Sequence, residues 1–203
     1  MKRVCLLMAL VCMLMVSCKK DGGDGRIQGH EYVDLGLSVK WATRNIGADN
    51  PEDYGHYFAW GETSPKEEYT KENCSTYGKD MDDISGNAEY DAATANWGGD
   101  WRMPTYDEQR ELLDRCTWTW ATENDVNGYK VTGPNGNSIF LPAAGFRYGS
   151  SLDDSGSRGY YWSSTPCDYN LDCSAYYLFF TSDFQYMSSY YRNLGLSVRP
   201  VVE

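Results

Sequence analysis

Side chains that could perform acid–base or metal chemistry are few in this chain of 203 residues. His30 and His56 are the only histidines, and the segments around them carry no His-Glu-x-x-His, Gly-x-Ser-x-Gly or Ser-x-x-Lys pattern. Five carboxylates between Asp80 and Ala93 could supply a pair for glycoside hydrolysis, but a solvated acidic loop explains them better. Neither these residues nor the adjacent Asp153 and Asp154 have the spacing of a calcium loop. We therefore expect no enzyme activity, no metal site and no bound cofactor.

The second half of the chain has instead the composition of a recognition surface. There is no Lys or Glu from Val131 to Val202, while Tyr, Ser, Asn, Asp and Phe are dense between Tyr160 and Arg199. Tyr offers a large rigid contact area with a hydroxyl at its tip, and Ser and Asn adapt their hydrogen bonds to a ligand. Single tyrosines could lie in the core, but so many interleaved polar residues cannot all be buried with their hydrogen bonds made.

Strand alternation assigns residues to this surface. In the run 176–180, Leu178 and Phe180 are expected in the core, and Tyr177 and Phe179 are expected to be exposed. A turn at 182–183 would bring the next strand alongside, with the preceding loop at the rim. The candidate ligand-binding residues are Tyr169, Asn170, Asp172, Tyr177, Phe179, Phe184, Tyr186, Tyr190 and Tyr191.

Four cysteines follow Cys18, namely Cys74, Cys116, Cys167 and Cys173. An even number of cysteines in an oxidising compartment allows three pairings. Cys167 and Cys173 enclose a short loop, and we expect a disulfide between them that would rigidify the loop and reduce the entropy lost on binding. Cys74 with Cys116 is the complementary pair, although Cys116 also fits the apolar face of a helix.

The first residues indicate export and lipid anchoring. Lys2 and Arg3 precede an apolar run, Val4 to Val16, that is too short to span a bilayer. Residues 15–18, Met-Val-Ser-Cys, resemble the lipobox of bacterial lipoproteins. The resemblance implies a signal peptide at 1–17, acylation of Cys18, a flexible tether at 18–29 and attachment to the outer membrane. An ordinary secretory signal with a chance cysteine is the alternative.

The net charge of the chain limits its possible binding partners, and the residues after Cys18 indicate where in the cell envelope it is displayed. The chain carries 29 acidic against 18 basic side chains, a net charge of −11, which repels nucleic acid and anionic lipid headgroups. We expect no nucleic-acid partner, and membrane contact only through the lipid anchor. Lys19, Lys20 and Asp21 resemble a surface-export signal, so display at the cell surface is expected, with the periplasmic face left open.

The elements that must position the aromatic residues indicate an α+β fold. Thr105 and Glu108 form a capping box ahead of Leu112 and Leu113, which predicts one helix near 105–117. Gly36 marks a hairpin within 29–48, and 66–100 reads as a long loop region. The remaining strands are expected at 54–60, 129–132, 138–141, 145–148, 160–163, 175–181, 184–190 and 196–201, within one domain at 30–203.

Several stretches then resemble one family. They are Tyr-Val-Asp-Leu-Gly-Leu-Ser-Val-Lys-Trp-Ala at 32–42, Trp-Gly-Glu at 60–62, Trp-Arg-Met-Pro-Thr at 101–105, Leu-Pro-Ala-Ala-Gly at 141–145, Gly-Tyr-Tyr-Trp-Ser-Ser-Thr at 159–165 and Ser-Val-Arg-Pro-Val at 197–201. Together they resemble the Fibrobacter succinogenes major paralogous domain of Bacteroidetes lipoproteins, which is similar to the formylglycine-generating-enzyme branch of the C-type-lectin fold. The resemblance implies a C-type-lectin-like domain with a C-terminal binding face. It also implies a structural role for Arg199, while Arg192 could belong to the fold or to the face.

Variable proteins of that fold are diversified by retroelements that substitute adenines in Asn codons. Within residues 167–193, almost every residue is of a type that such substitutions can produce, with Gln185 and Met187 as the exceptions. A static Tyr-rich surface explains the composition equally well. The leading hypothesis is an envelope lipoprotein that binds a protein or glycan through its C-terminal face. The alternative is a structural subunit of an envelope or fimbria-like assembly that uses the same face as an interface.

Overall fold

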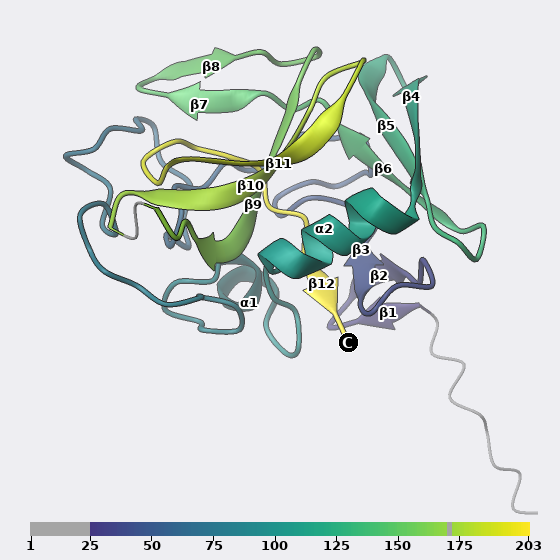
Figure 1. Ribbon diagram of the computed structural model, residues 1–203, viewed down its shortest axis with the longest axis horizontal. Helices are drawn as coiled ribbons and strands as arrows, with labels where there is room; N and C mark the ends of the chain where they lie inside the picture. The colour runs from purple at the N-terminus through teal and green to yellow at the C-terminus, as the bar shows by residue number, and fades with distance from the viewer. Residues whose placement is uncertain (1–24, 170–171) are drawn as a thin grey trace, which may run out of the picture.

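The computed structural model describes residues 25–169 and 172–203, and its strands outnumber its helices, as expected for an α+β fold. Four sheets make up the molecule (Figure 1). The first has the order β1-β2-β3-β12, the second β11-β10-β9 and the third β4-β5-β6, and β7 pairs with β8 as a hairpin. No helix among these residues is long and apolar enough to cross a membrane.

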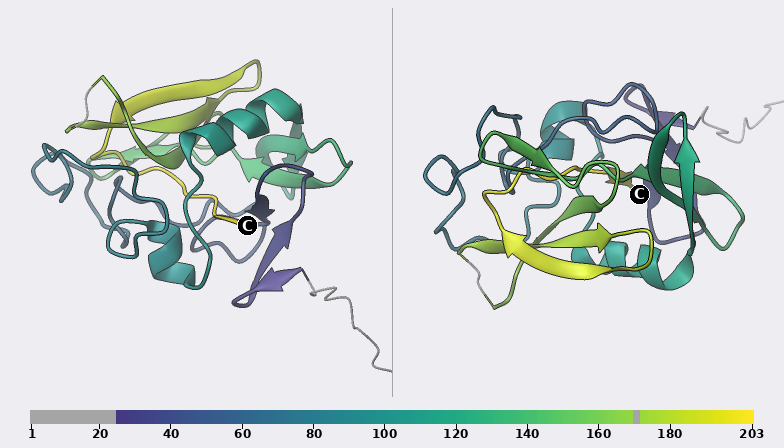
Figure 2. Two further views of the ribbon diagram at one scale, coloured as in Figure 1. Left: turned by 60° about the horizontal axis from the view of Figure 1, so that its bottom comes forward. Right: turned by 90° about the horizontal axis from the view of Figure 1, so that it is seen from above.

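The first sheet joins the two ends of the described chain. It contains β1 (Arg26–Ile27), β2 (His30–Val33), β3 (Lys40–Ala42) and β12 (Val201–Val202). The hairpin expected around Gly36 is present, with Val33 opposite Trp41, and Trp41 is also opposite Val201. Figure 2 shows the C-terminal segment ending beside this hairpin. Residues 26–29, expected in the tether, already belong to the hairpin of β1 and β2.

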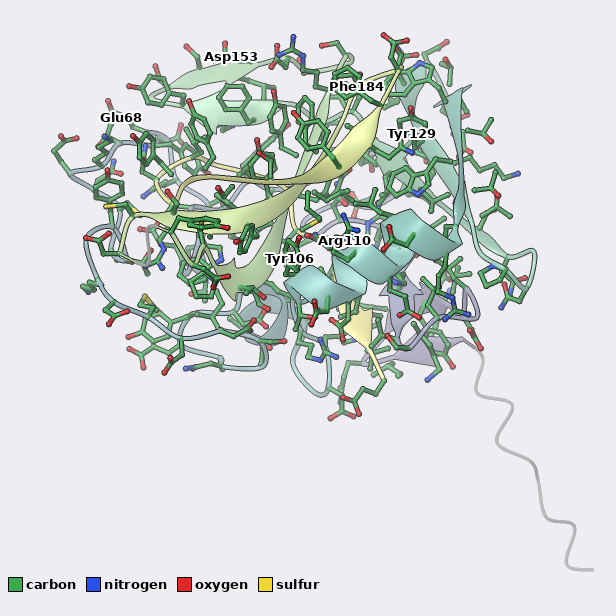
Figure 3. All side chains as sticks on the ribbon, in the orientation of Figure 1. Glu68, Tyr106, Arg110, Tyr129, Asp153 and Phe184 are labelled. Carbon is green, nitrogen blue, oxygen red and sulfur yellow. The ribbon has the colours of Figure 1, made fainter. Side chains whose placement is uncertain are left out.

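The one helix expected from the sequence is α2 (Tyr106–Arg115). Thr105 is its N-cap, and the capping box is complete, because the Thr105 hydroxyl accepts from Glu108 N–H while the Glu108 carboxylate accepts from Thr105 N–H. Arg102 donates two hydrogen bonds to the same carboxylate, at 2.6 and 2.8 Å. The helix packs beneath the second sheet, with Tyr106 against Tyr176 at a ring separation of 4.6 Å (Figure 3).

A second, shorter helix lies in the region expected to be irregular. It is α1 (Ala92–Trp97), and Asp91 caps it by accepting from Ala93 N–H and Thr94 N–H. Asp91 also accepts from the N–H groups of Gly86 and Met103, and its side chain is buried. Burial raises the pKa of this carboxyl, and the four N–H donors oppose that rise. This acidic residue is therefore part of the fold and not of a solvated loop.

The other two sheets and the hairpin contain the remaining strands. They are β4 (Thr117–Glu123), β5 (Val126–Thr132), β6 (Ser138–Pro142), β7 (Phe146–Tyr148), β8 (Ser151–Asp153), β9 (Gly159–Pro166), β10 (Ser174–Phe180) and β11 (Gln185–Tyr191). The sequence missed β4 and β8.

Two expected strands are not regular strands. In 54–60, Gly55 has φ +71°, and the N–H groups of His56, Phe58 and Trp60 donate to three separate residues, Ile46, Leu196 and Arg192. Only Phe58 forms a bridge, to Leu196. At the C-terminus, the strand expected at 196–201 is reduced to Val201–Val202, preceded by Pro200, which has no N–H to donate.

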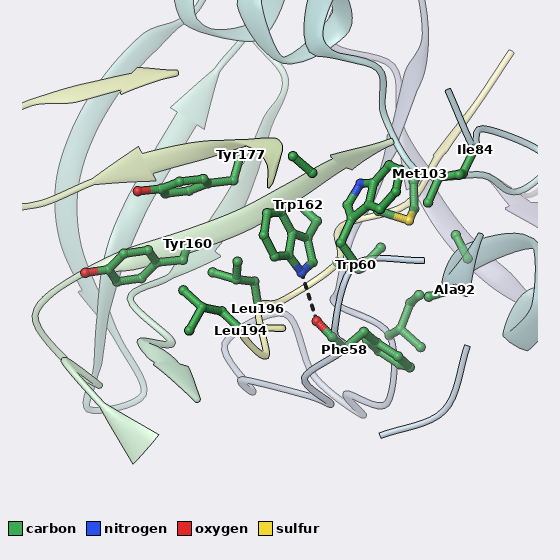
Figure 4. Close-up of a cluster of buried hydrophobic side chains, with 14 of the residues drawn as sticks. Phe58, Trp60, Ile84, Ala92, Met103, Tyr160, Trp162, Tyr177, Leu194 and Leu196 are labelled. Atoms are coloured by element: carbon green, nitrogen blue, oxygen red, sulfur yellow. Dashed lines mark hydrogen bonds between the residues drawn. The ribbon is translucent and has the colours of Figure 1, made fainter. Parts of the chain in front are cut away.

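The core has two main parts on opposite sides of the second sheet. One contains Leu178 and Phe180 with Leu112 and the third sheet, and the other contains Tyr177 and Phe179 with Trp60 and Trp162 (Figure 4). Strand β10 is the middle strand of its sheet and is covered on both faces. The β7–β8 hairpin lies above the second sheet in Figure 1, and Phe146 on β7 packs against the part of the core that contains Tyr177.

Candidate ligand-binding site

A cleft of about 280 Å³ opens on the Tyr177 side of the second sheet. We call it the aromatic cleft. Its walls come from β7, the turn after β8, strands β9, β10 and β11, and the segment before β12. The lining residues are Phe146, Asp154, Arg158, Tyr160, Tyr177, Phe179, Tyr186, Tyr190, Leu194 and Leu196.

The floor of the cleft is made of aromatic rings that hold one another in place. Tyr160 on β9 contacts three of them, with ring centroids 5.8 Å from Tyr177, 5.0 Å from Phe179 and 5.0 Å from Phe146. Figure 4 shows the Tyr160 and Tyr177 rings extending from neighbouring strands in the same direction, with Leu194 and Leu196 alongside. Such ring pairs add stability beyond the area they bury, and the floor is formed by contacts among the protein's own side chains.

Strand β11 supplies the outer wall. Tyr186 and Tyr190 lie opposite Phe179 and Ala175 in the β10–β11 register, which places them on the cleft side. Both remain about half exposed, at 46% and 50%. Phe184 stacks on Tyr186 at 5.9 Å and extends the wall to the end of the strand. Aromatic side chains that are neither buried nor isolated are typical of binding surfaces.

Asp154 and Arg158 form the polar wall. Asp154 lies in the left-handed region with φ +59°, and its carbonyl accepts from the N–H groups of Ser157 and Arg158. This turn brings Arg158 Nη1 to 3.1 Å from Asp154 Oδ2, and the Tyr160 hydroxyl donates to the same oxygen at 2.7 Å. Burial and the Asp154 carboxylate raise the pKa of Tyr160 above its usual value, so its hydroxyl keeps its proton beyond the pH at which an ordinary tyrosine ionises.

The remaining candidate residues lie apart from the cleft. Tyr191 contacts Tyr77, and Lys71 Nζ lies 4.3 Å from the centre of the Tyr191 ring. Tyr169 is the most exposed large aromatic side chain of the described residues, at 91%, and Asp172 is also exposed. Asn170 lies outside the described residues.

Two predicted exposures were wrong. Tyr177 and Phe179 were expected to be exposed, but they are only 7% and 8% exposed. The alternation itself is correct, since they lie on the face opposite Leu178 and Phe180. The reason for the error is that β7 and the 194–196 segment cover that face, and alternation within one strand cannot reveal a covering layer. Tyr177 and Phe179 therefore form the floor of the cleft and not its rim.

The expected disulfide between Cys167 and Cys173 is absent from the structure, in which both are free thiols. Cys167 is buried beside Tyr176, and its N–H donates to Ser174 O just beyond the end of the β9–β10 ladder. Cys173 instead lies beside Tyr77. Cys74 and Cys116 are free thiols as well, and the carbonyl of Asp172, next to Cys173, accepts a hydrogen bond from Gly78 N–H.

Both arginines near the C-terminus are structural. Arg199 is buried and donates to the Asn45 side chain and to the carbonyls of Ala42 and Phe140, as the sequence led us to expect. Arg192 is also buried, with its guanidinium 4.2 Å from the Trp60 ring and bonded to the carbonyls of Thr76 and Lys79. Arg192 therefore does not flank the binding face.

Sequence reasoning missed six residues of the cleft, namely Phe146, Asp154, Arg158, Tyr160, Leu194 and Leu196. The Asp-x-x-x-Arg spacing of 154 and 158 is a signal for an ion pair that could have been used. Tyr160 lies two residues before Trp162 on β9, and the two-residue period of a strand places both side chains on the same face. The contributions of Phe146 and the two leucines depend on packing between distant segments.

Residues 111–201 match the model of a family described as a domain of unknown function, DUF8237. No curated protein and no solved structure matches the chain. The matched stretch includes every residue that lines the aromatic cleft.

Proposed function

We propose that the protein is an envelope-anchored binding protein, without enzyme activity, that holds part of a protein or glycan ligand in the aromatic cleft. One observation carries the proposal. Tyr177, Phe179, Tyr186 and Tyr190, selected from the sequence as binding residues, line a single hollow. A concave apolar surface with a few convergent polar groups is the usual form of a ligand site.

Exposed tyrosines inside and outside the cleft allow a matched test. Tyr186→Ala with Tyr190→Ala removes the outer wall, and Tyr148→Ala on β7 removes a tyrosine that is 60% exposed but does not line the cleft. The chain would be screened against arrayed glycans and surface proteins. We expect a ligand whose binding falls at least about tenfold in the double variant and is unchanged in the control. Ligands that bind the double variant normally would refute the site.

The same exposed rings would serve the alternative function, an interface between subunits of an assembly. Analytical ultracentrifugation of the full chain in detergent separates the two functions. A monodisperse monomer supports ligand binding, whereas self-association that is lost in the Tyr186→Ala, Tyr190→Ala variant supports the assembly role.

We also propose that Cys18 is acylated and that the protein is displayed on the outer membrane. The support is the lipobox at 15–18 and the polar tether that follows it. The lipobox and residues 18–24 of the tether lie outside the described residues. Cys18→Ala should abolish labelling by a palmitate analogue, and normal labelling of that variant would contradict the anchor.

For the fold, we propose a C-type-lectin-like domain of the Fibrobacter succinogenes major paralogous type. The support is the motif residues and the pairing of strands from both ends of the chain, β3 with β12. Retroelement diversification of 167–193 stays a hypothesis, which sequencing of this locus in related isolates would test. Substitutions confined to the first two bases of codons that can arise from an Asn template codon are the expected pattern.

A further inference from the structure

We propose that the aromatic cleft receives one uncharged pyranose ring of a glycan. This inference rests on the proposed binding function and narrows its ligand class. Three properties of the cleft carry it, namely its size, the arrangement of apolar and polar groups, and its balance of charge.

The size of the cleft suits a single ring. Its volume of about 280 Å³ lies just below the range of about 300–1,000 Å³ that is usual for small-molecule sites. The floor is made of aromatic rings in mutual contact, so it cannot widen without separating Tyr160 from Tyr177 and Phe179. One residue of a longer chain can enter while the rest stays outside.

Apolar and polar groups are segregated in the way that a pyranose requires. A pyranose has C–H groups on its faces and hydroxyls around its edge. Tyr160, Tyr177 and Phe179 offer an apolar floor for the face. Asp154 can accept hydrogen bonds from hydroxyls, Arg158 can donate to them, and the hydroxyl of Tyr186 can do either. The Tyr160 hydroxyl donates to Asp154 and holds it in its ion pair with Arg158 before a ligand binds. Little side-chain entropy is therefore lost on binding.

An apolar peptide side chain fits these groups poorly. It would cover Asp154 and Arg158 without offering hydrogen bonds, and burying unsatisfied polar groups is costly. The ring of donors and acceptors around the floor would then have no partner in the ligand.

The balance of charge disfavours ions. Aromatic rings with a carboxylate would attract a cation, but Arg158 lies 3.1 Å from the Asp154 carboxylate and neutralises it. An incoming cation would meet the positive charge of Arg158. An acidic sugar would meet a chain whose net charge is −11. A neutral ligand meets neither penalty.

Two neighbouring carboxylates provide a matched pair of variants. Asp154→Asn keeps the shape of the side chain and removes a charged acceptor from the cleft, whereas Asp153→Asn changes an exposed carboxylate on β8 that does not line it. The full chain, purified in detergent, would be titrated with methyl glycosides of neutral hexoses and N-acetylhexosamines, with N-acetylneuraminic acid and with choline. Saturation-transfer NMR reports binding of each probe.

We expect at least one neutral glycoside to bind, with affinity at least about tenfold weaker in Asp154→Asn and unchanged in Asp153→Asn. Thermal melting of each variant checks that it folds. If Asp154→Asn does not fold, Tyr186→Ala at the exposed wall serves in its place, with Tyr148→Ala as its control. Strongest binding by choline or by N-acetylneuraminic acid would overturn the proposal.

A further outcome separates this inference from the proposed function. If no glycoside binds but a protein ligand is lost on Tyr186→Ala, the glycan assignment fails and the binding function stands. If neither glycosides nor proteins depend on the cleft, both fail.

Discussion

Trp60 and Trp162 each donate an indole hydrogen bond to the backbone of the segment that contains the other. The Trp162 indole donates to Phe58 O at 2.8 Å (Figure 4), and the Trp60 indole donates to Ser163 O at 2.9 Å. Each ring thus bonds to the backbone beside the other. This connection fixes β9 against the irregular segment that ends at Trp60, and β9 carries Tyr160, the central ring of the cleft floor.

Replacing Trp162 with Phe should destabilise the protein by about 1–3 kcal/mol, because it removes a buried donor and leaves unfilled space beside Trp60. Urea denaturation followed by circular dichroism measures the change. Trp97→Phe, at a half-buried ring that stacks on His30, is the control and should cost less. An equal loss in both variants would mean that the reciprocal bonds contribute nothing specific.

Thr105→Ala should lower the free energy of unfolding by about 1 kcal/mol, because the hydroxyl that accepts from Glu108 N–H is lost from the N-cap of α2. Thr105→Ser keeps the acceptor and should retain most of the stability. Chemical denaturation of the two variants makes the comparison. If alanine is tolerated as well as serine, then Arg102 and Glu108 hold the helix start without the cap.

Stability should fall as the pH rises above about 10, where an unfolded tyrosine ionises. Burial raises the pKa of Tyr161 to about 12 and also raises the pKa of Tyr57 and Tyr160. The folded state therefore binds more protons than the unfolded state in this range, so the free energy of unfolding decreases with pH. Below about pH 10 both states are protonated, and the contribution of these tyrosines is constant.

Burial lowers the pKa of Arg199 to about 10, so this group makes the free energy of unfolding increase with pH. It is one group against several tyrosines, whose opposite effect is larger. Urea denaturation from neutral pH to about pH 11 measures the slope. Tyr161→Phe removes one of the titrating groups and should flatten the slope. A free energy of unfolding that does not change over this range would contradict the assignment.

The cysteines should react as free thiols. Alkylation of the native, unreduced protein should label Cys173 before Cys167, because Cys173 is partly exposed and Cys167 is buried. Peptide mapping should then recover no peptide that links the two. A disulfide between them would mean that the β9–β10 loop adopts another arrangement in the oxidised protein.

Local patterns were sufficient for the elements whose signals are contained in a few neighbouring residues. The capping box at Thr105 and Glu108 determines where α2 begins, since both partners lie within one turn. Gly36 marks the first hairpin, and the alternation in β10 separates Tyr177 from Leu178. The composition of the C-terminal half also identified four of the residues that line the cleft.

Burial and pairing depended on contacts between segments far apart in the chain. The 54–60 segment has the composition of a strand, but its N–H groups find partners in three separate places, so no ladder forms. Cys167 and Cys173 are close in sequence, but one packs beside Tyr176 and the other beside Tyr77. Sequence spacing does not determine the direction in which each thiol points.

The aromatic cleft combines features that local patterns predict with features that depend on contacts between distant segments. The sequence by itself determined which residues share a face of β10, because the two-residue period of a strand is a property of the backbone. Only the tertiary structure decided that Phe146 and Leu196 cover that face, and that Asp154 and Arg158 stand at its edge. Such contacts depend on how separate elements pack, and packing between elements is not encoded in any single stretch of residues.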